Sequence, residues 1–156
     1  AGLMLTKSGP KVIEFNCRFG DPECQALMPL MGKEFASVLY SCARGELEKA
    51  PKLSFKNLYS TCIVAAAKGY PDNPQKGDQI NINLEPNPAL QVFHAGTTLD
   101  QFDNIITTGG RVLSVVAQGE SFDKAFNLAY DSLKNIKFDG IHFRNDIGYQ
   151  VRNITS

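Results

Sequence analysis

The sequence predicts an α+β protein, in which strands and helices occupy separate stretches of the chain. Short runs rich in β-branched and apolar residues dominate residues 62–117, and one long amphipathic helical pattern follows them. A polar segment at 46–57, with one proline and three lysines, separates this part from a predicted hairpin and two short helices. We therefore expect two domains, 1–50 and 51–156.

Two short strands are predicted near the N-terminus, at 3–6 and 12–17. Both runs are rich in aliphatic residues, and Gly9-Pro10 between them is a turn signal. The chain begins without methionine, inside the first of these strands, and it has no signal-peptide pattern. We therefore expect the chain to be the tail of a longer protein.

Two helices should follow the hairpin. Asp21 is suited to cap a helix that begins at Pro22, and Pro29 should kink or end this helix near Met28 because proline has no amide hydrogen to donate. A second helix, ending at Gly45, is predicted from one apolar face. That face consists of Phe35, Val38, Leu39 and Cys42.

The second domain should contain a small sheet covered by one helix. Strands are predicted at 62–67, 79–83, 91–93, 105–108 and 112–117. Ser121 is a suitable cap for the following helix. The apolar stripe of that helix consists of Phe122, Phe126, Ala129, Leu133 and Ile136. This stripe should pack on one face of the sheet.

Composition and charge exclude several classes of function. The 156 residues are 43% hydrophobic and 21% charged, which is ordinary for a globular protein. Sixteen basic and sixteen acidic residues leave no net charge, so we expect no nucleic-acid partner. No apolar run is long enough to predict a membrane span. Four cysteines without a C-x-x-C pair indicate reduced thiols in a cytoplasmic protein, with oxidised pairs as the alternative, and no zinc site.

The second predicted strand carries the residues with the clearest chemistry. Alternation places Ile13, Phe15 and Cys17 toward a core, and it places Glu14, Asn16 and Arg18 together on the other face. A carboxylate and an amide oxygen suit Mg²⁺, which keeps most of its positions for water and phosphates, and the fork of an arginine suits phosphate or carboxylate.

The alternative for this face is an ordinary solvated strand surface. In that interpretation Arg18 only pairs with Asp21 or Glu23, and such exposed pairs contribute little to stability. The short pattern alone favours this solvated-surface interpretation, because many edge strands carry as much polarity by chance.

A longer string favours the functional interpretation. Residues 11–25, KVIEFNCRFGDPECQ, closely resemble the signature of the phosphoribosylamine-glycine ligase family of the ATP-grasp superfamily. The resemblance continues, in the family's order, through residues 68–71, 92–97, 109–113 and 144–148. It implies that 1–50 are the end of an ATP-grasp domain and that 51–156 are a small C-terminal sheet domain with a packed helix.

The resemblance also implies a reaction. Family members join glycine to 5-phosphoribosylamine through glycyl phosphate, releasing ADP and phosphate in purine biosynthesis. Glu14 and Asn16 match the family's ligands for the Mg²⁺ (or Mn²⁺) that accompanies ATP. Arg18 would hold the transferring phosphate, and Asp21 would contact substrate or only cap its helix. The family's upstream segments are missing, so we expect no activity without that N-terminal part as partner.

Other polar residues are weaker candidates. We expect His94 and His142 to be structural, and we expect Cys17 not to act as a nucleophile because no base is predicted beside it. Arg111 is a more plausible phosphate ligand than Arg144. The glycines at 69, 96 and 109–110 either approach a ligand or form turns.

Two rival functions remain open at the level of sequence. A non-catalytic interaction module, docking on a partner chain, would show an exposed apolar patch in place of a polar strand face. A carboxylating or biotin-dependent ATP-grasp enzyme would share the metal-binding strand, but the continuation from Arg18 to Glu23 argues against it.

Overall fold

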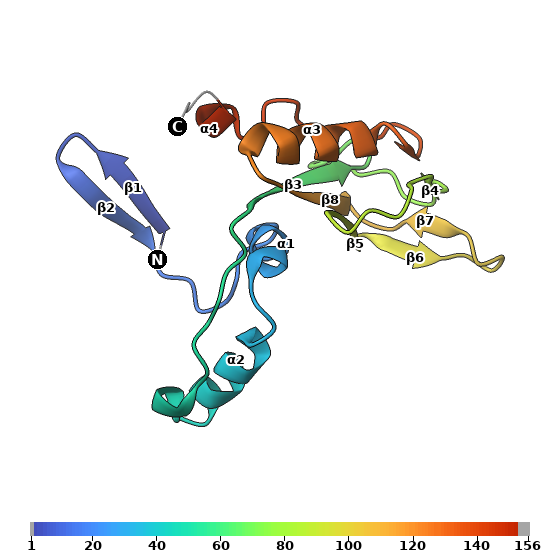
Figure 1. The fold of residues 1–156 in the computed structure, drawn as a ribbon. Coiled ribbons are helices and arrows are strands. Elements are labelled where there is room, and N and C mark those ends of the chain that lie inside the picture. The colour runs from blue at the N-terminus through green and yellow to red at the C-terminus, as the bar shows by residue number, and fades with distance from the viewer. Residues whose placement is uncertain (1, 153–156) are drawn as a thin grey trace.

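The N-terminal part of the structure is a β-hairpin. The computed structural model describes residues 2–152, and its first elements are β1 (Gly2–Thr6) and β2 (Gly9–Glu14), which pair antiparallel. The predicted hairpin is therefore confirmed, although β2 ends at Glu14 and not at residue 17. Figure 1 shows the hairpin standing away from the other elements.

The prediction that Ile13, Phe15 and Cys17 face a core is wrong for this chain. Ile13 is 62% exposed and Phe15 is 82% exposed, and Cys17 is exposed as well. Within the described residues 2–152, no helix or second sheet lies against the hairpin (Figure 1), and two strands alone cannot bury a face. The alternating pattern indicated which side chains are apolar, but it carries no information on whether another layer covers them.

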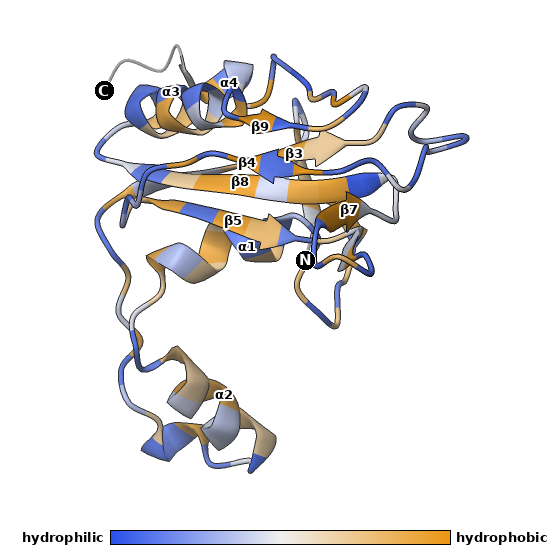
Figure 2. Cartoon of the chain, turned by 90° about the vertical axis from the view of Figure 1, so that its right-hand side faces the viewer, coloured by the Kyte–Doolittle hydropathy of each residue, from blue (hydrophilic) through white to orange (hydrophobic). Residues whose placement is uncertain are grey.

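Two short helices follow the hairpin. Helix α1 (Glu23–Leu27) leads into the 3₁₀ turn η1 (Met28–Leu30) around the buried Pro29, so the predicted end of the helix near Met28 is confirmed. Helix α2 (Phe35–Ala43) ends before Gly45, whose φ of +69° favours glycine. None of the residues of α2 is buried, and the helix extends away from the sheet (Figure 2).

The start of α1 differs from the prediction. Pro22 occupies the cap position, and no side chain caps the helix there. The carboxylate of Glu23, inside the first turn, accepts a hydrogen bond from the amide of Gly20 at 3.0 Å. The expected cap, Asp21, has other partners, which are described with the candidate site below.

A three-stranded antiparallel sheet forms the centre of the second part. Its order is β3 (Tyr59–Ala66), β8 (Arg111–Gly119) and β5 (Leu90–His94), with β8 in the middle. These strands confirm the predictions at 62–67, 91–93 and 112–117. The central strand β8 is buried from Val112 to Gln118, because a helix packs on each face of the sheet.

Two smaller strand pairs lie beside this sheet. β6 (Thr97–Leu99) pairs with β7 (Ile105–Thr107), and β4 (Asn81–Ile82) pairs with β9 (Ile136–Lys137). The sequence predicted β4 and β7 but neither β6 nor β9, which are only three and two residues long. The last helix, α4 (Tyr149–Arg152), was not predicted either.

Helix α3 (Phe122–Leu133) covers one face of the sheet, as predicted (Figure 2). The Ser121 hydroxyl caps it by accepting a hydrogen bond from the amide of Lys124 at 3.2 Å. The helix ends earlier than its apolar pattern indicated, since Ile136 belongs to β9, where it is buried in the same core. Helix α1 packs on β3 and β8, so the sheet lies between two helices.

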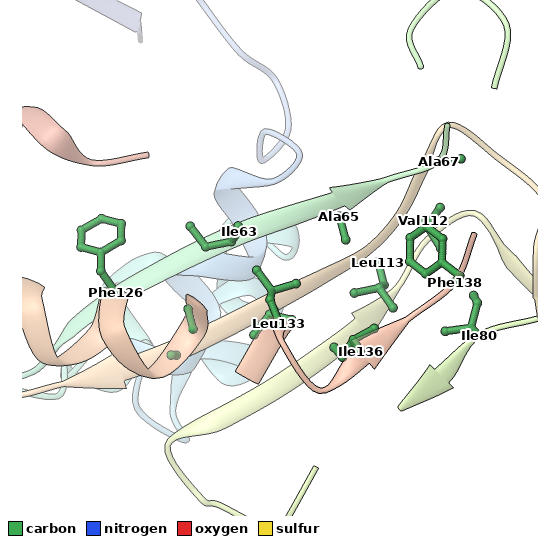
Figure 3. Packing of buried hydrophobic residues seen from close by; sticks show 13 residues of the cluster. Ile63, Ala65, Ala67, Ile80, Val112, Leu113, Phe126, Leu133, Ile136 and Phe138 are labelled. Carbon is green, nitrogen blue, oxygen red and sulfur yellow. The ribbon is translucent and has the colours of Figure 1, made fainter. Parts of the chain in front are cut away.

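The hydrophobic core lies between α3 and the sheet (Figure 3). Leu113 from β8 and Leu133 from α3 are at most 1% exposed and meet there with Ile63 from β3. No helix among residues 2–152 combines the length and the apolar character that crossing a bilayer requires.

A cavity in the hydrophobic core should lower the free energy of unfolding. Leu133→Ala removes a buried side chain from the contact between α3 and β8, so the free energy of unfolding should fall by about 2–5 kcal/mol. Leu99→Ala, at a position 59% exposed, should change it by less than about 0.5 kcal/mol. Urea unfolding followed by circular dichroism measures both, and an equal cost for the two variants would contradict the assigned core.

Candidate functional site

A β-bulge lies directly before Glu14. Gly2 pairs with Glu14 and Leu3 pairs with Val12, so Ile13 is an extra residue in β2. Bulges change the direction of the following side chain and are frequent beside functional sites. The side chain of Glu14 lies over Gly2, where an added Cβ would come within 3.1 Å of its Cγ. The bulge and the glycine together position this carboxylate.

Asn16 lies beside Glu14. Its amide nitrogen Nδ2 donates a hydrogen bond to Oε1 of Glu14 at 3.2 Å. Strand alternation does not explain this proximity, since Asn16 lies beyond the end of β2. The two oxygen-bearing side chains are nevertheless together, as the spacing predicted.

The side-chain oxygens of Glu14 and Asn16 are suitable ligands for a hard divalent cation. Their mutual hydrogen bond uses the amide nitrogen, so Oδ1 of Asn16 and Oε2 of Glu14 are not part of it. Among residues 2–152 no cluster of three or more His, Cys, Asp or Glu side chains is arranged to hold a metal. Two protein oxygens suit Mg²⁺ or Mn²⁺ that takes its other ligands from water and phosphates.

Arg18 is exposed and carries no ion pair to the acids that the alternative interpretation named. Its Nη1 donates to the backbone oxygen of Phe19 at 3.2 Å. Asp21 is paired with Arg111, and Glu23 binds the amide of Gly20. One bond uses one of the five N–H donors of the guanidinium, so the side chain keeps donors for an anion.

The partner of Asp21 was not anticipated from the sequence. Nη2 of Arg111 donates to Oδ2 of Asp21 at 2.7 Å, and Nη1 donates to the backbone oxygen of the same residue at 3.0 Å. The other carboxylate oxygen of Asp21 accepts from Nε2 of Gln25 at 3.0 Å. The pairing joins residues 90 positions apart, and no local pattern could have indicated it.

A pocket of about 330 Å³ lies where these two segments meet. Its lining includes Pro22 from the N-terminal part, Cys62 and Val64 from β3, and Arg111 from β8. Arg144 also contributes, but two hydrogen bonds at 2.8 and 2.7 Å pair it with Asp146 and hold the pKa of that carboxyl below its usual range. Both arginines of the pocket therefore already have carboxylate partners.

The two histidines have ordinary surroundings. Nδ1 of His94 lies 3.1 Å from the hydroxyl of Thr97, so this exposed ring has a local partner, as expected of a structural histidine. His142 exchanges backbone hydrogen bonds with Ala66, at 2.8 and 3.1 Å, and extends the edge of the sheet.

The glycines singled out in the sequence are required by packing within the chain. A Cβ on Gly96 would lie 2.7 Å from Cα of Gly109, and one on Gly110 would collide with the ring of Tyr70. Gly69 has a φ of +82° and belongs to a turn. Close approach of backbone to backbone and to an aromatic ring explains these positions without a ligand.

Two parts of this chain match two domains of one known enzyme. The ATP-grasp (A) domain model of phosphoribosylglycinamide synthetase matches residues 1–24, and the model of the C domain of the same enzyme matches residues 60–150. The hairpin with Glu14, Asn16, Arg18 and Asp21 therefore resembles the end of an ATP-grasp domain, and the sheet resembles the domain that follows it. The fold and these matches place the chain in the class of proteins that contain an ATP-grasp domain.

Individual relatives agree with the family models. Phosphoribosylamine–glycine ligase of Caldanaerobacter subterraneus is 45% identical over 147 residues, which are 94% of this chain and 34% of that protein. The human trifunctional purine biosynthetic protein adenosine-3 is 44% identical over 97% of this chain and 15% of its own length. The crystal structure of phosphoribosylamine–glycine ligase from Thermotoga maritima superposes with a TM-score of 0.81 at 32% identity, over 93% of this chain and 35% of that one.

The chain thus belongs to the phosphoribosylglycinamide synthetase family and is homologous to the C-terminal part of its members. It spans only 34–36% of the first four curated relatives it matches. The expected domain boundary at residues 50 and 51 lies in the interval 25–59, which neither family model covers, and it stays a prediction.

The cysteines provide a test of the local environments. All four thiols are free, and burial raises the pKa of Cys62, whereas Cys17 and Cys42 are exposed. Because the thiolate is the reactive form, iodoacetamide at neutral pH should label Cys17 and Cys42 first and Cys62 more slowly, as followed by peptide mass spectrometry. Equal labelling rates of Cys62 and Cys17 would contradict the structure around β3.

Proposed function

We propose that this chain is the C-terminal part of a phosphoribosylamine–glycine ligase and carries two ligands of the metal that accompanies ATP. The observation that supports this most is the contact of Glu14 with Asn16 at 3.2 Å, within the segment that matches an ATP-grasp domain. The complete enzyme would join glycine to 5-phosphoribosylamine through glycyl phosphate and release ADP and phosphate in the cytoplasm.

Four residues of this chain would each have a role in the reaction. Glu14 and Asn16 would hold Mg²⁺ or Mn²⁺ through their side-chain oxygens. When bound, the metal neutralises charge on the phosphate oxygens of ATP during transfer. Arg18 would orient the transferring phosphate through its unused N–H donors. Asp21, whose side chain is 56% exposed beside Arg111, is the proposed contact to a substrate at the edge of this group.

The remaining ligands would come from the N-terminal part of the same enzyme. The hairpin exposes Leu5 at 84% and Phe15 at 82%, and large apolar side chains exposed together mark a surface that another structure covers. The ATP-grasp match is confined to residues 1–24. We propose that the upstream segments of the ligase pack on this hairpin and complete both the nucleotide site and the glycine site.

The rival of a non-catalytic interaction module explains the same exposed apolar side chains. It does not explain why a bulge and a glycine bring a carboxylate and an amide together beside them. The proposed function accounts for both features, because the apolar side chains contact the rest of the enzyme while the polar pair contacts the metal.

The metal ligands predict a loss of turnover without a loss of folding. In the full-length ligase that carries this chain, Glu14→Ala or Asn16→Ala should lower kcat about 100-fold or more, the effect expected when transition-state electrostatics are removed. Thermal unfolding should stay close to wild type, since neither side chain belongs to the hydrophobic core. ADP release in a coupled assay and differential scanning fluorimetry measure the two quantities.

Glu120→Ala is the matched control for these variants. Glu120 is an exposed acid on the second domain with a local partner, Lys124, so its loss should leave turnover unchanged. Wild-type turnover of both Glu14→Ala and Asn16→Ala at limiting magnesium would refute the assignment.

The chain by itself should not catalyse ligation. It covers 34–36% of the length of the first four curated relatives, so the purified 156-residue protein should show no glycine-dependent ADP release above a buffer control. The full-length enzyme, assayed in parallel at the same molar concentration, provides the positive control. Glycine-dependent turnover by the chain alone would show that the proposed dependence on the upstream part is wrong.

A further inference from the structure

We propose that Arg111 is a positioning residue for the proposed metal and phosphate site. It would act by holding the turn at Asp21 and Pro22 on the sheet domain, which fixes where the segment from Glu14 to Arg18 leaves the hairpin. The inference rests on the proposed function and adds to it a residue of the second domain that touches neither metal nor nucleotide.

The contact is specific to the shape of a guanidinium. Nη2 of Arg111 binds the carboxylate of Asp21 at 2.7 Å while Nη1 binds the backbone oxygen of the same residue at 3.0 Å. Two parallel donors on one planar group fix both the position and the orientation of the turn. A lysine ammonium would keep the charge but could not reproduce this paired geometry.

The turn held by Arg111 is tied internally as well. The amide of Gly20 donates to the carboxylate of Glu23 at 3.0 Å, and the amide of Cys24 donates to the oxygen of Gly20 at 2.8 Å. The side chain of Gln25 reaches back to Asp21 at 3.0 Å. A shift of Asp21 would therefore be transmitted to Gly20 and the residues that precede it.

Other contacts support this segment beside the Arg111 contact. Helix α1 packs on β3 and β8, but none of its residues is buried. The rings of Phe19 and Phe35 lie 6.0 Å apart and form one further contact. Arg111 starts strand β8, which is buried from Val112 to Gln118, so its backbone is anchored in the sheet.

The expected effect of losing Arg111 is local. An exposed ion pair contributes little to global stability, and the side chain of Arg111 is 41% exposed. The hydrogen bonds of the turn should open more often, while those of β8 should not. A residue that only stabilised the fold would affect both alike.

Hydrogen exchange on the 156-residue chain tests the contact without any catalytic activity. Arg111→Met should raise the exchange rates of the amides of Gly20 and Cys24 about tenfold, the effect of losing a hydrogen bond to a charged group, and should leave Val115 in β8 unchanged. Arg111→Lys should give a smaller increase. Arg44→Met, which removes an exposed arginine paired with the nearby Glu46, is the control and should change neither.

Kinetics of the full-length ligase test the positioning role. Arg111→Met should lower kcat and raise the Mg²⁺ concentration needed for half-maximal activity several-fold, less than the roughly 10- to 100-fold typical when a direct hydrogen-bond partner of a metal ligand is lost, while KM for 5-phosphoribosylamine stays unchanged. If Arg111 instead binds the substrate phosphate, KM for 5-phosphoribosylamine would rise and the Mg²⁺ dependence would not change, which would overturn the proposal.

The two assays separate the possible failures. Unchanged exchange at Gly20 and Cys24 in Arg111→Met would overturn the contact itself, whatever the enzyme does. Faster exchange combined with an unchanged Mg²⁺ dependence would overturn the positioning role. A wild-type full-length protein without glycine-dependent turnover would overturn the proposed function, and the role of Arg111 in it, while the exchange data would still report on the turn.

Discussion

Burial of β8 on both faces is the constraint on which the other parts of the structure depend. Helix α3 covers one face of this strand and α1 packs on the other, while β3 and β5 pair with its two edges. A shift of one residue in its register would exchange the buried faces, so the register is strongly fixed. The position of Arg111 at the start of the strand is fixed with it, and through Arg111 the turn at Asp21.

The two parts of the chain differ in how they are stabilised. Residues 60–150 contain a core of their own, with thirteen buried hydrophobic residues in one cluster between α3 and the sheet. The hairpin and α2 contain no buried residue, and most of their apolar side chains are exposed. A part with its own core can fold alone, whereas an apolar hairpin without a covering layer depends on further contacts. This difference agrees with the two family matches, an ATP-grasp domain at residues 1–24 and the C domain at residues 60–150.

Sequence periodicity correctly predicted the helices and strands that are determined by local sequence pattern. The hairpin, the helix capped by Ser121 and the three main strands follow from local pattern and were found. The failures have a shared cause, since each depends on a partner elsewhere in space. The apolar face of β2 lacks a layer to pack on, Ile136 leaves its helix to pair with β4, and Asp21 binds Arg111 in place of capping a helix.

The candidate site was likewise predictable only in part from the sequence. Spacing placed Glu14 beside Asn16, but the structure achieves this with a bulge at Ile13 that alternation cannot reveal. The central claim, that these two side chains hold the metal of an ATP-dependent ligase, is tested most directly by crystals of the full-length enzyme with Mn²⁺ and a non-hydrolysable ATP analogue. We predict an anomalous peak within about 2.0–2.2 Å of an oxygen of each side chain, close to the distances of hard six-coordinate cations. A Mn²⁺ ion bound to the analogue by other ligands, with Glu14 and Asn16 remote from it, would contradict the claim.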